Sequence, residues 1–280
     1  MSKVWFVTGS SRGLGRHFVE TALDRGDSVA ATARNSSSLE DLVAEYGDAV
    51  LPLAMDVTDK ATVSEAVDRT VARFGRLDVV VNNAGFAQIG AVEELTEDQL
   101  RNQLETNLFG AVWVVQAALP QLRAQGSGHI IQLSSAAGLI AAPLGGAYSA
   151  SKWGLEGLNE SLAHEVSPFG IKLTIIEPGG FATRNGDNPN PLDNGHVAKT
   201  MPEYDDLRRQ LAGMNASQPK GDPAAAARAL LKIVDSDNPP IRVLFGLGFY
   251  PMVQQAYAER LQNWEDWKTL SLEAQGDLEP

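Results

Sequence analysis

Seven short, almost wholly apolar runs recur along this chain of 280 residues. They read VWFV, SVAATA, VLPLAM, LDVVV, HIIQL, KLTII and IRVLF, and amphipathic segments of helical length separate the first six. A strand without polar alternation is buried on both faces, and regular alternation of strands with helices is typical of a parallel sheet covered on both sides. The sequence therefore predicts an α/β fold, with a doubly wound parallel sheet and helices on both faces.

Charge and composition exclude several classes of function. The chain carries 23 basic and 35 acidic residues, and a net charge of −12 repels phosphate backbones and anionic membranes. It has no cysteine, and its four histidines show no ligand-like spacing, so we expect neither a disulfide nor a metal site. No apolar run approaches the roughly 20 residues of a membrane span. We expect a cytoplasmic protein that binds neither nucleic acid nor membranes.

The predicted organisation is one domain over residues 1–280 with two special segments. The sequence from Gly179 to Asp222 is rich in Gly, Asn, Asp and Pro, which favours an irregular excursion. We interpret residues 183–222 as a substrate-binding lobe, a surface insertion without a role being the alternative. Residues 246–280 form an aromatic C-terminal extension, whose rings we expect to pack on the body or on a partner subunit.

A glycine-rich turn, VTGSSRGLGR, joins the first predicted strand to the first predicted helix. Its glycines permit a sharp turn, a close approach of phosphate to the backbone, and a helix that starts tight against the sheet. The helix then directs the positive end of its dipole at the phosphate. The turn predicts a dinucleotide site that includes Gly9, Ser11, Arg12, Gly13, Leu14 and Gly15.

The stretch GAYSASKWGLEG places Tyr148 and Lys152 four residues apart, on one face of a predicted helix. A phenol has a pKa of about 10, and a neighbouring ammonium group favours the phenolate, which predicts a lowered pKa for Tyr148. A casual surface pair is the alternative. Ser134 and Ser135 end the fifth apolar run, at the carboxyl edge where open α/β sheets bind ligands. This context favours a proton-transfer site.

Together with Asn82-Asn83-Ala84-Gly85 after the fourth apolar run, these motifs resemble the short-chain dehydrogenase/reductase family. The resemblance covers residues 3 to about 183, in the family's order. It implies a Rossmann fold and hydride transfer between a nicotinamide cofactor and a carbonyl or alcohol. It also implies a catalytic tetrad of Asn107, Ser135, Tyr148 and Lys152.

Each member of that tetrad has an implied role. Tyr148 exchanges a proton with the substrate oxygen, and Ser135 hydrogen-bonds that oxygen, with Ser134 as the alternative serine. Lys152 bonds the nicotinamide ribose, and Asn107 holds a water that relays protons. The resemblance further implies cofactor contacts from Asp56, Val57, Asn83, Ala84, Gly85, Tyr148, Lys152, Pro178, Gly179 and Thr183.

The end of the second apolar run bears on the choice of cofactor. An NAD enzyme places an acid there, on the ribose 2′-hydroxyl, whereas this chain has Ala33 followed by Arg34. Arg34 and Arg12 could instead clamp a 2′-phosphate, because guanidinium donors match phosphate oxygens. Solvated surface arginines are the alternative. We expect NADP(H) to be preferred over NAD(H).

The predicted substrate pocket looks apolar to mixed, which favours a lipophilic ketone or aldehyde. The sequence is most similar to the family branches that include hydroxysteroid- and retinol-type dehydrogenases.

The family implies a homodimer or homotetramer formed through two long helices, here 97–125 and 148–167. Glu93 and Glu94 read as a charged loop before the first of them. Two other functions stay open: a catalytically silent NADP-binding regulator, and a non-redox epimerase or dehydratase.

Overall fold

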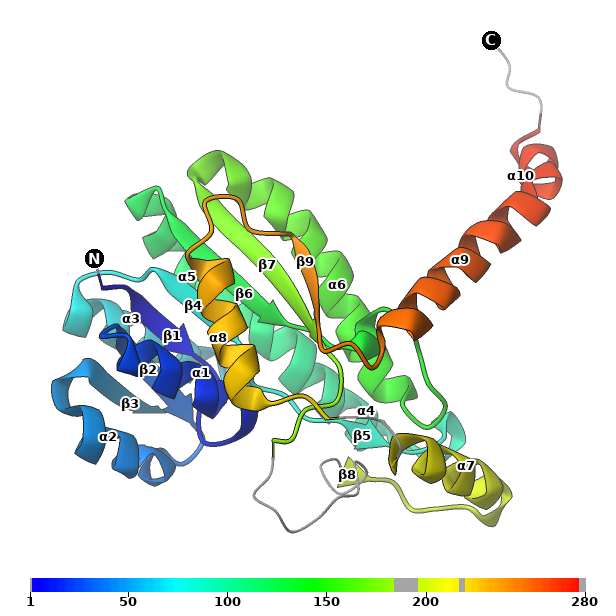
Figure 1. Ribbon diagram of the computed structural model, residues 1–280, viewed down its shortest axis with the longest axis horizontal. Coiled ribbons are helices and arrows are strands. Elements are labelled where there is room, and N and C mark those ends of the chain that lie inside the picture. The colour runs from blue at the N-terminus through cyan, green and yellow to red at the C-terminus, as the bar shows by residue number, and fades with distance from the viewer. Residues whose placement is uncertain (1, 184–195, 217–219, 277–280) are drawn as a thin grey trace.

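The computed structural model describes residues 2–183, 196–216 and 220–276, and its centre is a seven-stranded sheet (Figure 1). The strand order is β3-β2-β1-β4-β6-β7-β9, and all neighbouring pairs are parallel. Helices bury both faces of this parallel sheet, which is why these runs are apolar on both faces. The strands are β1 (Val4–Val7), β2 (Ser28–Ala33), β3 (Val50–Ala54), β4 (Val79–Asn82), β6 (Gly128–Leu133), β7 (Ile171–Pro178) and β9 (Arg242–Phe245).

Helices cover both faces of the sheet. Along β1, Trp5 and Val7 point to one apolar core and Phe6 points to the other, because side chains alternate along a strand. The first core is closed by α1 (Gly13–Asp24), α2 (Glu40–Tyr46) and α8 (Pro223–Val234), and the second by α3 (Lys60–Phe74), α5 (Gly110–Gln125) and α6 (Gly146–Val166). The predicted doubly wound fold is confirmed.

The sheet order places a ligand crevice between β1 and β4. From β1 the chain proceeds outward to β2 and β3 on one side, and then returns to build β4, β6, β7 and β9 on the other. Open α/β sheets bind ligands at such a switch point, outside the carboxyl ends of the strands. The glycine-rich turn follows β1, and the NNAG segment begins at the end of β4, so both motifs border this crevice.

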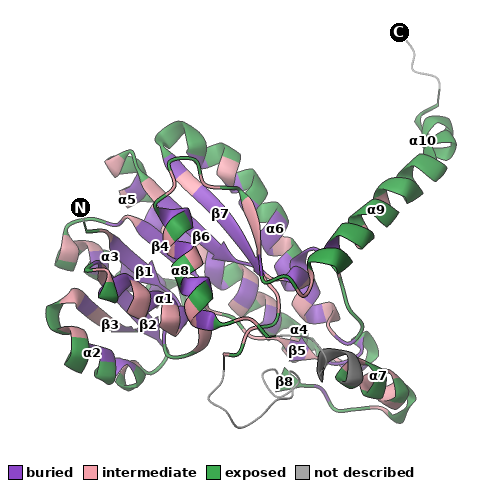
Figure 2. Ribbon diagram, in the orientation of Figure 1, coloured by how far each residue is buried: buried purple, intermediate pink, exposed green. Residues whose placement is uncertain are grey.

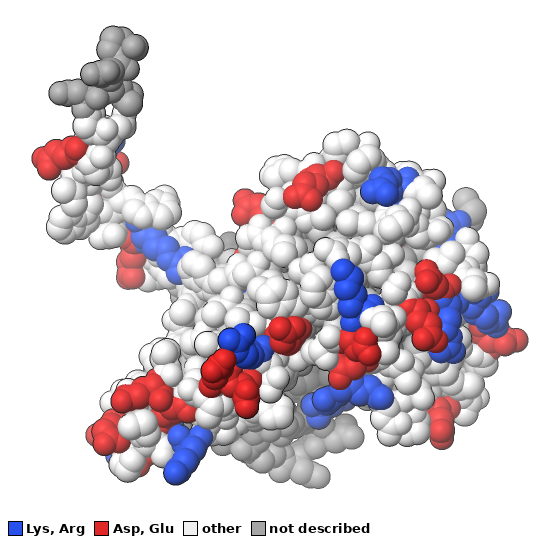
Figure 3. Space-filling model, turned by 180° about the vertical axis from the view of Figure 1, so that it is seen from behind, with Lys and Arg blue, Asp and Glu red and all other residues white. Residues whose placement is uncertain are grey.

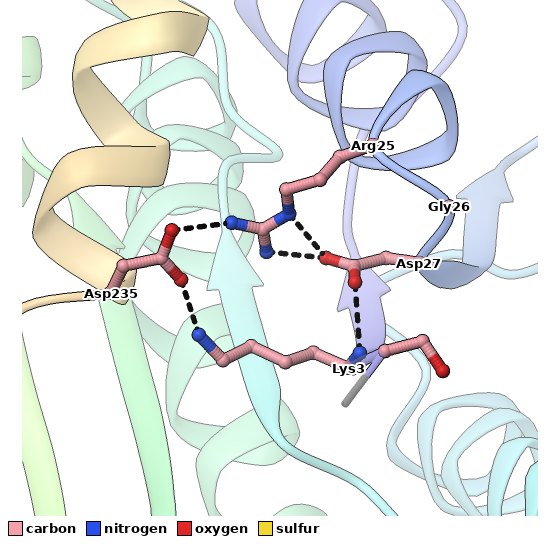
Figure 4. Close-up of a pocket in the computed structure, with 6 residues that line it drawn as sticks. Lys3, Arg25, Gly26, Asp27 and Asp235 are labelled. Atoms are coloured by element: carbon pink, nitrogen blue, oxygen red, sulfur yellow. Dashed lines mark hydrogen bonds and ion pairs between the residues drawn. The ribbon is translucent and has the colours of Figure 1, made fainter.

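An ion-pair network closes the opposite, amino-terminal edge of the sheet (Figure 4). The buried carboxylate of Asp27 accepts hydrogen bonds from the backbone N–H of Lys3 at 2.8 Å and from the Trp5 indole at 2.7 Å. The guanidinium of Arg25 pairs with Asp27 and also with Asp235, at 2.7 Å, and the Lys3 ammonium pairs with Asp235 as well. The network joins the end of α8 to β1.

The predicted helix over residues 97–125 is present, with an irregular turn inside it. It runs as α4 (Glu97–Leu104), a π-helical turn (Glu105–Phe109) and α5. Asn107 lies within the π turn and is buried. Single π turns are rare and occur often at functional sites. Asparagine is a poor α-helix former, and Asn107 lies in this turn rather than in a regular stretch of α-helix.

The segment predicted to be a substrate lobe is more regular than the sequence analysis expected. It contains β8 (His196–Val197), which pairs with β5 (Gln88–Ile89), and the helix α7 (Asp205–Ala216). The expectation of an irregular segment was wrong for α7, because Leu, Arg, Gln and Ala favour a helix and its first turn carries two aspartates. Residues 184–195 and 217–219 of the predicted lobe lie outside the described residues.

The C-terminal extension forms an arm that projects from the body (Figures 1 and 2). It consists of α9 (Tyr250–Asp266) and α10 (Lys268–Gln275). At its root, the Arg260 guanidinium lies over the Trp153 ring at 4.9 Å and over the Tyr257 ring at 5.1 Å. Further out, Trp264 and Trp267 are 67% and 60% exposed, so these two rings do not pack on the body, and their packing on a partner subunit stays a prediction.

The surface mixes charges of both signs. On the face drawn in Figure 3, acidic and basic side chains lie interspersed over the body. Many of them form ion pairs, such as Arg16 with Glu20 and Asp41. In the part of the chain that the structure describes, no helix combines the length and apolar character needed to cross a bilayer.

Candidate active site

The glycine-rich turn leaves the first helix open to an anion. Gly9 and Gly13 adopt positive φ angles of 68° and 64°, a conformation that favours glycine. The N-cap residue Arg12 makes no side-chain cap hydrogen bond, and the first turn of α1 has no acidic residue. The N–H groups of that turn therefore lack a side-chain cap, which suits a phosphate.

A hydrogen-bonded lock joins this turn to the NNAG segment. Thr8 Oγ1 accepts from the backbone N–H groups of Asn83 and Ala84, each at 2.9 Å. The Asn83 amide donates back to the carbonyls of Thr8 and Gly9, at 2.9 and 3.1 Å. A Cβ on Gly15 would lie 2.3 Å from that amide nitrogen, so only glycine fits. Sequence reasoning missed Thr8, although it directly precedes Gly9.

Two arginine side chains have no partner among the described residues: Arg12 in the glycine-rich turn and Arg34 directly after β2. Arg12 and Arg34 are exposed and make no ion pair, hydrogen bond or ring contact with any residue that the structure describes. Every other arginine within the described ranges has such a partner. Both guanidinium groups therefore have all their donors available to a ligand.

Asp56 and Val57, two of the residues expected to contact the cofactor, follow β3. The Asp56 carboxylate accepts from the backbone N–H and the hydroxyl of Thr58, at 3.0 and 2.8 Å. Val57 is buried against the start of α5, where a Cβ on Gly110 would lie 2.8 Å from a Val57 methyl. Both side chains thus shape this end of the crevice through contacts within the chain.

Ser135 and Tyr148 meet at the carboxyl end of β6. The Ser135 hydroxyl accepts from the backbone N–H of Ala137 at 3.1 Å. It lies beside the Tyr148 phenol, close enough to lower the pKa of that phenol. Ser134 instead has a buried hydroxyl without a partner among the described residues. The structure therefore places Ser135, and not Ser134, beside the Tyr148 phenol.

Burial raises the pKa of the Tyr148 phenol, and the neighbouring Ser135 hydroxyl opposes the rise. In the chain without cofactor, the cost of burying a phenolate outweighs the effect of the lysine, and a sequence does not display that cost. The lowered pKa expected when an oxidised nicotinamide adds its positive charge stays a prediction.

Lys152 is buried one turn beyond the tyrosine. Its ammonium donates to the Leu133 carbonyl at 2.8 Å and lies 5.7 Å from the centre of the Tyr148 ring. Burial lowers the pKa of Lys152 to about 8, and the negative charge of Glu156 opposes that change. A lysine that titrates close to neutral pH is suited to proton transfer.

The Asn107 amide ties the π turn to the helix that carries Tyr148. Its oxygen accepts from the backbone N–H of Phe86 at 3.1 Å, and its nitrogen donates to the Phe86 carbonyl at 2.9 Å and to Ser151 Oγ at 3.0 Å. Ser151 donates to the Tyr148 carbonyl at 2.7 Å. Sequence reasoning missed Ser151, although serines often bond a backbone carbonyl three residues earlier.

The segment after β7 returns to the glycine-rich turn. Pro178 ends the strand, and the Gly179 backbone N–H donates to the Phe245 carbonyl at 2.9 Å. Thr183 lies beside Gly13, where a glycine Cβ would be 3.4 Å from the threonine Cβ. The predicted nicotinamide-side residues thus border the same crevice as the predicted phosphate site.

A buried carboxylate holds the substrate lobe to the body. Glu94 accepts from the backbone N–H groups of Ala91 and Met201, at 2.8 and 2.6 Å, and pairs with Arg208 of α7. Tyr204 donates to Glu93 at 2.6 Å. The interpretation of this pair as a charged loop was wrong for Glu94, because its contacts to the lobe bury it.

A family model for short chain dehydrogenases matches residues 3–192, which contain the glycine-rich turn, Ser135, Tyr148 and Lys152. The chain belongs to the short-chain dehydrogenase family. In the described part of this dehydrogenase, no group of three or more His, Cys, Asp or Glu side chains could hold a metal ion.

Named relatives of this short-chain dehydrogenase are oxidoreductases. Oxidoreductase BOA17 of Botryotinia fuckeliana is 42% identical over 275 residues, covering 97% of this chain and 99% of the relative. A 3-ketodihydrosphingosine reductase of Bacteroides thetaiotaomicron is 36% identical, covering 92% and 91%. The crystal structure of a short-chain dehydrogenase from Streptomyces avermitilis superposes with a TM-score of 0.89 at 38% identity, covering 98% of both chains.

The family supports an oxidoreductase activity on alcohol and carbonyl groups with NAD or NADP. Solved chains of the same fold carry NADP in one case and NAD in another. The residues of this chain fit a dinucleotide, since the uncapped first turn of α1 and its positive-φ glycines offer free N–H groups to phosphate.

Proposed function

We propose that this short-chain dehydrogenase interconverts a ketone or aldehyde and its alcohol with NADP(H), and that Tyr148 is the general acid and base. The observation that carries the proposal is the buried Lys152 ammonium, which lies 5.7 Å from the centre of the Tyr148 ring and is bonded to the end of β6, two residues before Ser135. All three lie at the carboxyl edge of the sheet, beside the crevice that suits a dinucleotide.

In the reducing direction, Tyr148 donates its phenolic proton to the carbonyl oxygen of the substrate. The Ser135 hydroxyl hydrogen-bonds the same oxygen and stabilises the charge that develops on it. When bound, the cofactor supplies the hydride. In the oxidising direction Tyr148 takes the proton back from the alcohol.

Lys152 and Asn107 support this proton transfer. The ammonium of Lys152 replenishes the proton that Tyr148 gives up and bonds the ribose of the cofactor, while its tie to Leu133 fixes its position. Asn107 holds the Phe86 backbone and Ser151, and through Ser151 the helical turn of Tyr148. A water held near Asn107 would complete the proton path.

The preference for NADP(H) rests on Arg12 and Arg34. Their guanidinium groups are exposed and have no partner among the described residues, and Arg34 directly follows β2. An acid on the ribose 2′-hydroxyl would repel a phosphate at that point, and this chain has none in that place. The two arginines would pair with the 2′-phosphate.

The proposed substrate is a lipophilic carbonyl compound. A small groove, lined by Val92, Leu95 and Leu100 together with Gly146, borders the start of α6, two residues before Tyr148. The similarity to a 3-ketodihydrosphingosine reductase points in the same direction, since that relative is named for a long-chain ketone.

We also propose a homodimer or homotetramer formed through the long helices. Phe109, Trp153 and Leu158 leave apolar surface exposed on these helices, at 39%, 44% and 36%. A molar mass measured by light scattering should equal two or four chains. A strictly monomeric mass across the micromolar range would contradict the assembly.

Two other functions predict different fates for the cofactor. A silent regulator binds NADPH without consuming it, and an epimerase or dehydratase returns it unchanged after each turnover. The Ser135 hydroxyl beside the Tyr148 phenol favours the redox reaction, because a regulator does not need a proton donor.

The deciding experiment measures initial rates of NADPH and of NADH consumption against aliphatic, aromatic, steroidal and long-chain ketones and aldehydes. Wild-type protein and Tyr148→Phe are compared. We expect turnover with at least one carbonyl compound, a preference for NADPH, and loss of at least 99% of the rate in the variant with NADPH binding retained. Equal rates in both proteins would remove the phenol from the reaction.

A further inference from the structure

A group of charged side chains lies directly behind Lys152. Glu156 is one turn further along α6, so both side chains project from the same face of the helix. Arg242, the first residue of β9, places its Nε 3.0 Å from Glu156 Oε2 and donates to Glu160 at 2.9 Å. Glu177 of β7 lies 3.7 Å from the same Nε.

Burial separates the members of this group. The side chains of Glu156 and Glu177 are 8% and 4% exposed, whereas that of Glu160 is 55% exposed. A buried charge is costly unless a charge of the opposite sign compensates it. The ammonium of Lys152 makes its hydrogen bond to a neutral carbonyl, that of Leu133. Its compensation must therefore come from a charge nearby.

Glu156 has one carboxylate oxygen free to face this region. Its Oε2 is engaged by Arg242, but its Oε1 is buried without a partner among the described residues. The space beside Oε1 exists because residue 138 is glycine: a Cβ there would lie 3.2 Å from Glu156 Oε1 and 2.6 Å from Ser134 Oγ. The free oxygen thus adjoins the strand end that anchors Lys152.

We infer that Glu156 is a positioning residue that keeps Lys152 protonated in its buried place, while Arg242 holds the Glu156 carboxylate. The inference rests on the proposed function, in which Lys152 acts beside Tyr148. The groups facing the ammonium are Tyr148 and Glu156 on α6, and the end of β6 offers it only neutral atoms. Glu177 on β7 and Arg242 on β9 lie behind Glu156.

The charges of the group balance with a single proton. Lys152 and Arg242 bring two positive charges, and Glu156, Glu160 and Glu177 bring three negative ones when all are ionised. Burial, together with the charge of Glu156, raises the pKa of Glu177 to about 7. Glu177 is therefore the carboxyl that takes up a proton near neutral pH, and Glu156 is the carboxylate closer to Arg242.

Replacing Glu156 by glutamine removes the charge and keeps the shape. In that variant burial lowers the pKa of Lys152 without an opposing effect, because Glu156 is the one charged group among the described residues that raises this pKa. A single opposite charge at this range shifts a pKa by about one unit or more. Lys152 should lose its proton at a correspondingly lower pH in Glu156→Gln.

The test is an NMR titration of Lys152 in the full-length protein without cofactor, using isotopically labelled lysine and Lys152→Met to assign the signal. The wild type, Glu156→Gln and Glu160→Gln are compared. Glu160 is the matched control, because it also pairs with Arg242 from α6 but is exposed. We expect a midpoint lowered by about one unit or more in Glu156→Gln, and an unchanged midpoint in Glu160→Gln. A wild-type midpoint in Glu156→Gln overturns the inference.

A second variant protects the test against a folding defect. Glu156→Asp keeps the charge but withdraws it by one methylene, so its midpoint should fall by less than that of Glu156→Gln. If the glutamine variant does not fold, Glu156→Met removes the charge at the same place, and a folded Glu156→Met with the wild-type midpoint overturns the inference.

The pH profile of turnover provides an independent readout. In Glu156→Gln the alkaline limb should move to lower pH by the same amount as the Lys152 midpoint, with the Kd for NADPH unchanged. A merely structural role would reduce the rate at every pH without moving the limb. If the wild type turns over no carbonyl compound, the proposed function fails, whereas the titration of Lys152 still decides the present inference.

Discussion

The ammonium of Lys152 is hydrogen-bonded to the carbonyl of Leu133, the last residue of β6. Ser135, whose hydroxyl lies beside the Tyr148 phenol, is two residues beyond that carbonyl. One strand end therefore sets the positions of both groups that flank the phenol. The spacing between proton donor, hydroxyl and ammonium depends on how β6 packs against α6, rather than on the helix alone.

Replacing Arg34 by aspartate should weaken NADPH far more than NADH. The substitution removes a free guanidinium and introduces a carboxylate that repels a 2′-phosphate, so we expect the KM for NADPH to rise by about 10- to 100-fold. Steady-state kinetics with both cofactors give the comparison. Arg73→Asp is the control, because Arg73 is also exposed but pairs with Asp48 on the outside of the fold. Equal losses with both cofactors would place Arg34 away from the phosphate.

Replacing Arg208 by alanine should loosen the substrate lobe. The variant leaves the buried Glu94 carboxylate without its cationic partner, so α7 loses its main polar tie to the body. We expect the KM for the carbonyl substrate to rise several-fold while the KM for NADPH stays the same. Arg209→Ala, the exposed neighbour that pairs only with Asp206 among the described residues, should have no effect. An unchanged substrate KM in Arg208→Ala would separate α7 from substrate binding.

Replacing Glu177 by glutamine should change the pH dependence of stability. The folded-state pKa of Glu177 is raised to about 7 from 4.5, so the folded chain holds an extra proton between these values. Because the folded chain binds this proton more tightly than the unfolded chain, the contribution of Glu177 to the free energy of unfolding falls as pH rises from about 4.5 to 7. Glutamine imitates the protonated form, so the variant should match the wild type at pH 5 and exceed it at pH 8, by an amount on the order of 1 kcal/mol.

Urea unfolding at pH 5 and pH 8 measures this difference. Glu160→Gln serves as the control, because Glu160 is exposed and its carboxyl pKa is lowered by Arg242. A stability difference between Glu177→Gln and the wild type that is the same at both pH values would show that Glu177 does not titrate in this range.

Replacing Asp27 by alanine should destabilise the fold without altering the chemistry. The variant strips acceptors from the buried Trp5 indole and from the Lys3 backbone, and leaves Arg25 with Asp235 alone. Breaking a buried, hydrogen-bonded charge typically costs about 2 to 4 kcal/mol. Asp235→Ala, at the half-exposed end of the same network, should cost less. Equal unfolding free energies for Asp27→Ala and the wild type, measured in urea, would contradict the network's role.

The central fold was predictable because its signals are local. Apolar runs mark strands buried on both faces, and glycines at 9 and 13 mark a turn that needs positive φ, so neighbouring residues suffice to place both. The helical spacing of Tyr148 and Lys152 is also local, as is the position of Ser135 at a strand end. These features put the catalytic groups at one edge of the sheet.

The features that sequence reasoning missed depend on distant contacts. Arg242 meets Glu156 across 86 residues of sequence, and Arg208 meets Glu94 across 114. The pKa of Tyr148 follows from burial, which no motif displays. The helix α7 was not predicted because turn-forming residues precede it. The projecting arm was not predicted because aromatic residues indicate that a segment packs against something, but they do not indicate against which surface.

The Asp27 network and the proton-transfer groups lie at opposite ends of the same seven strands. Substitutions at the amino-terminal edge can thus lengthen or shorten the lifetime of the folded molecule while the geometry around Tyr148 stays as it is. Robustness to heat and the choice of substrate are therefore traits that can evolve, or be engineered, independently in this chain.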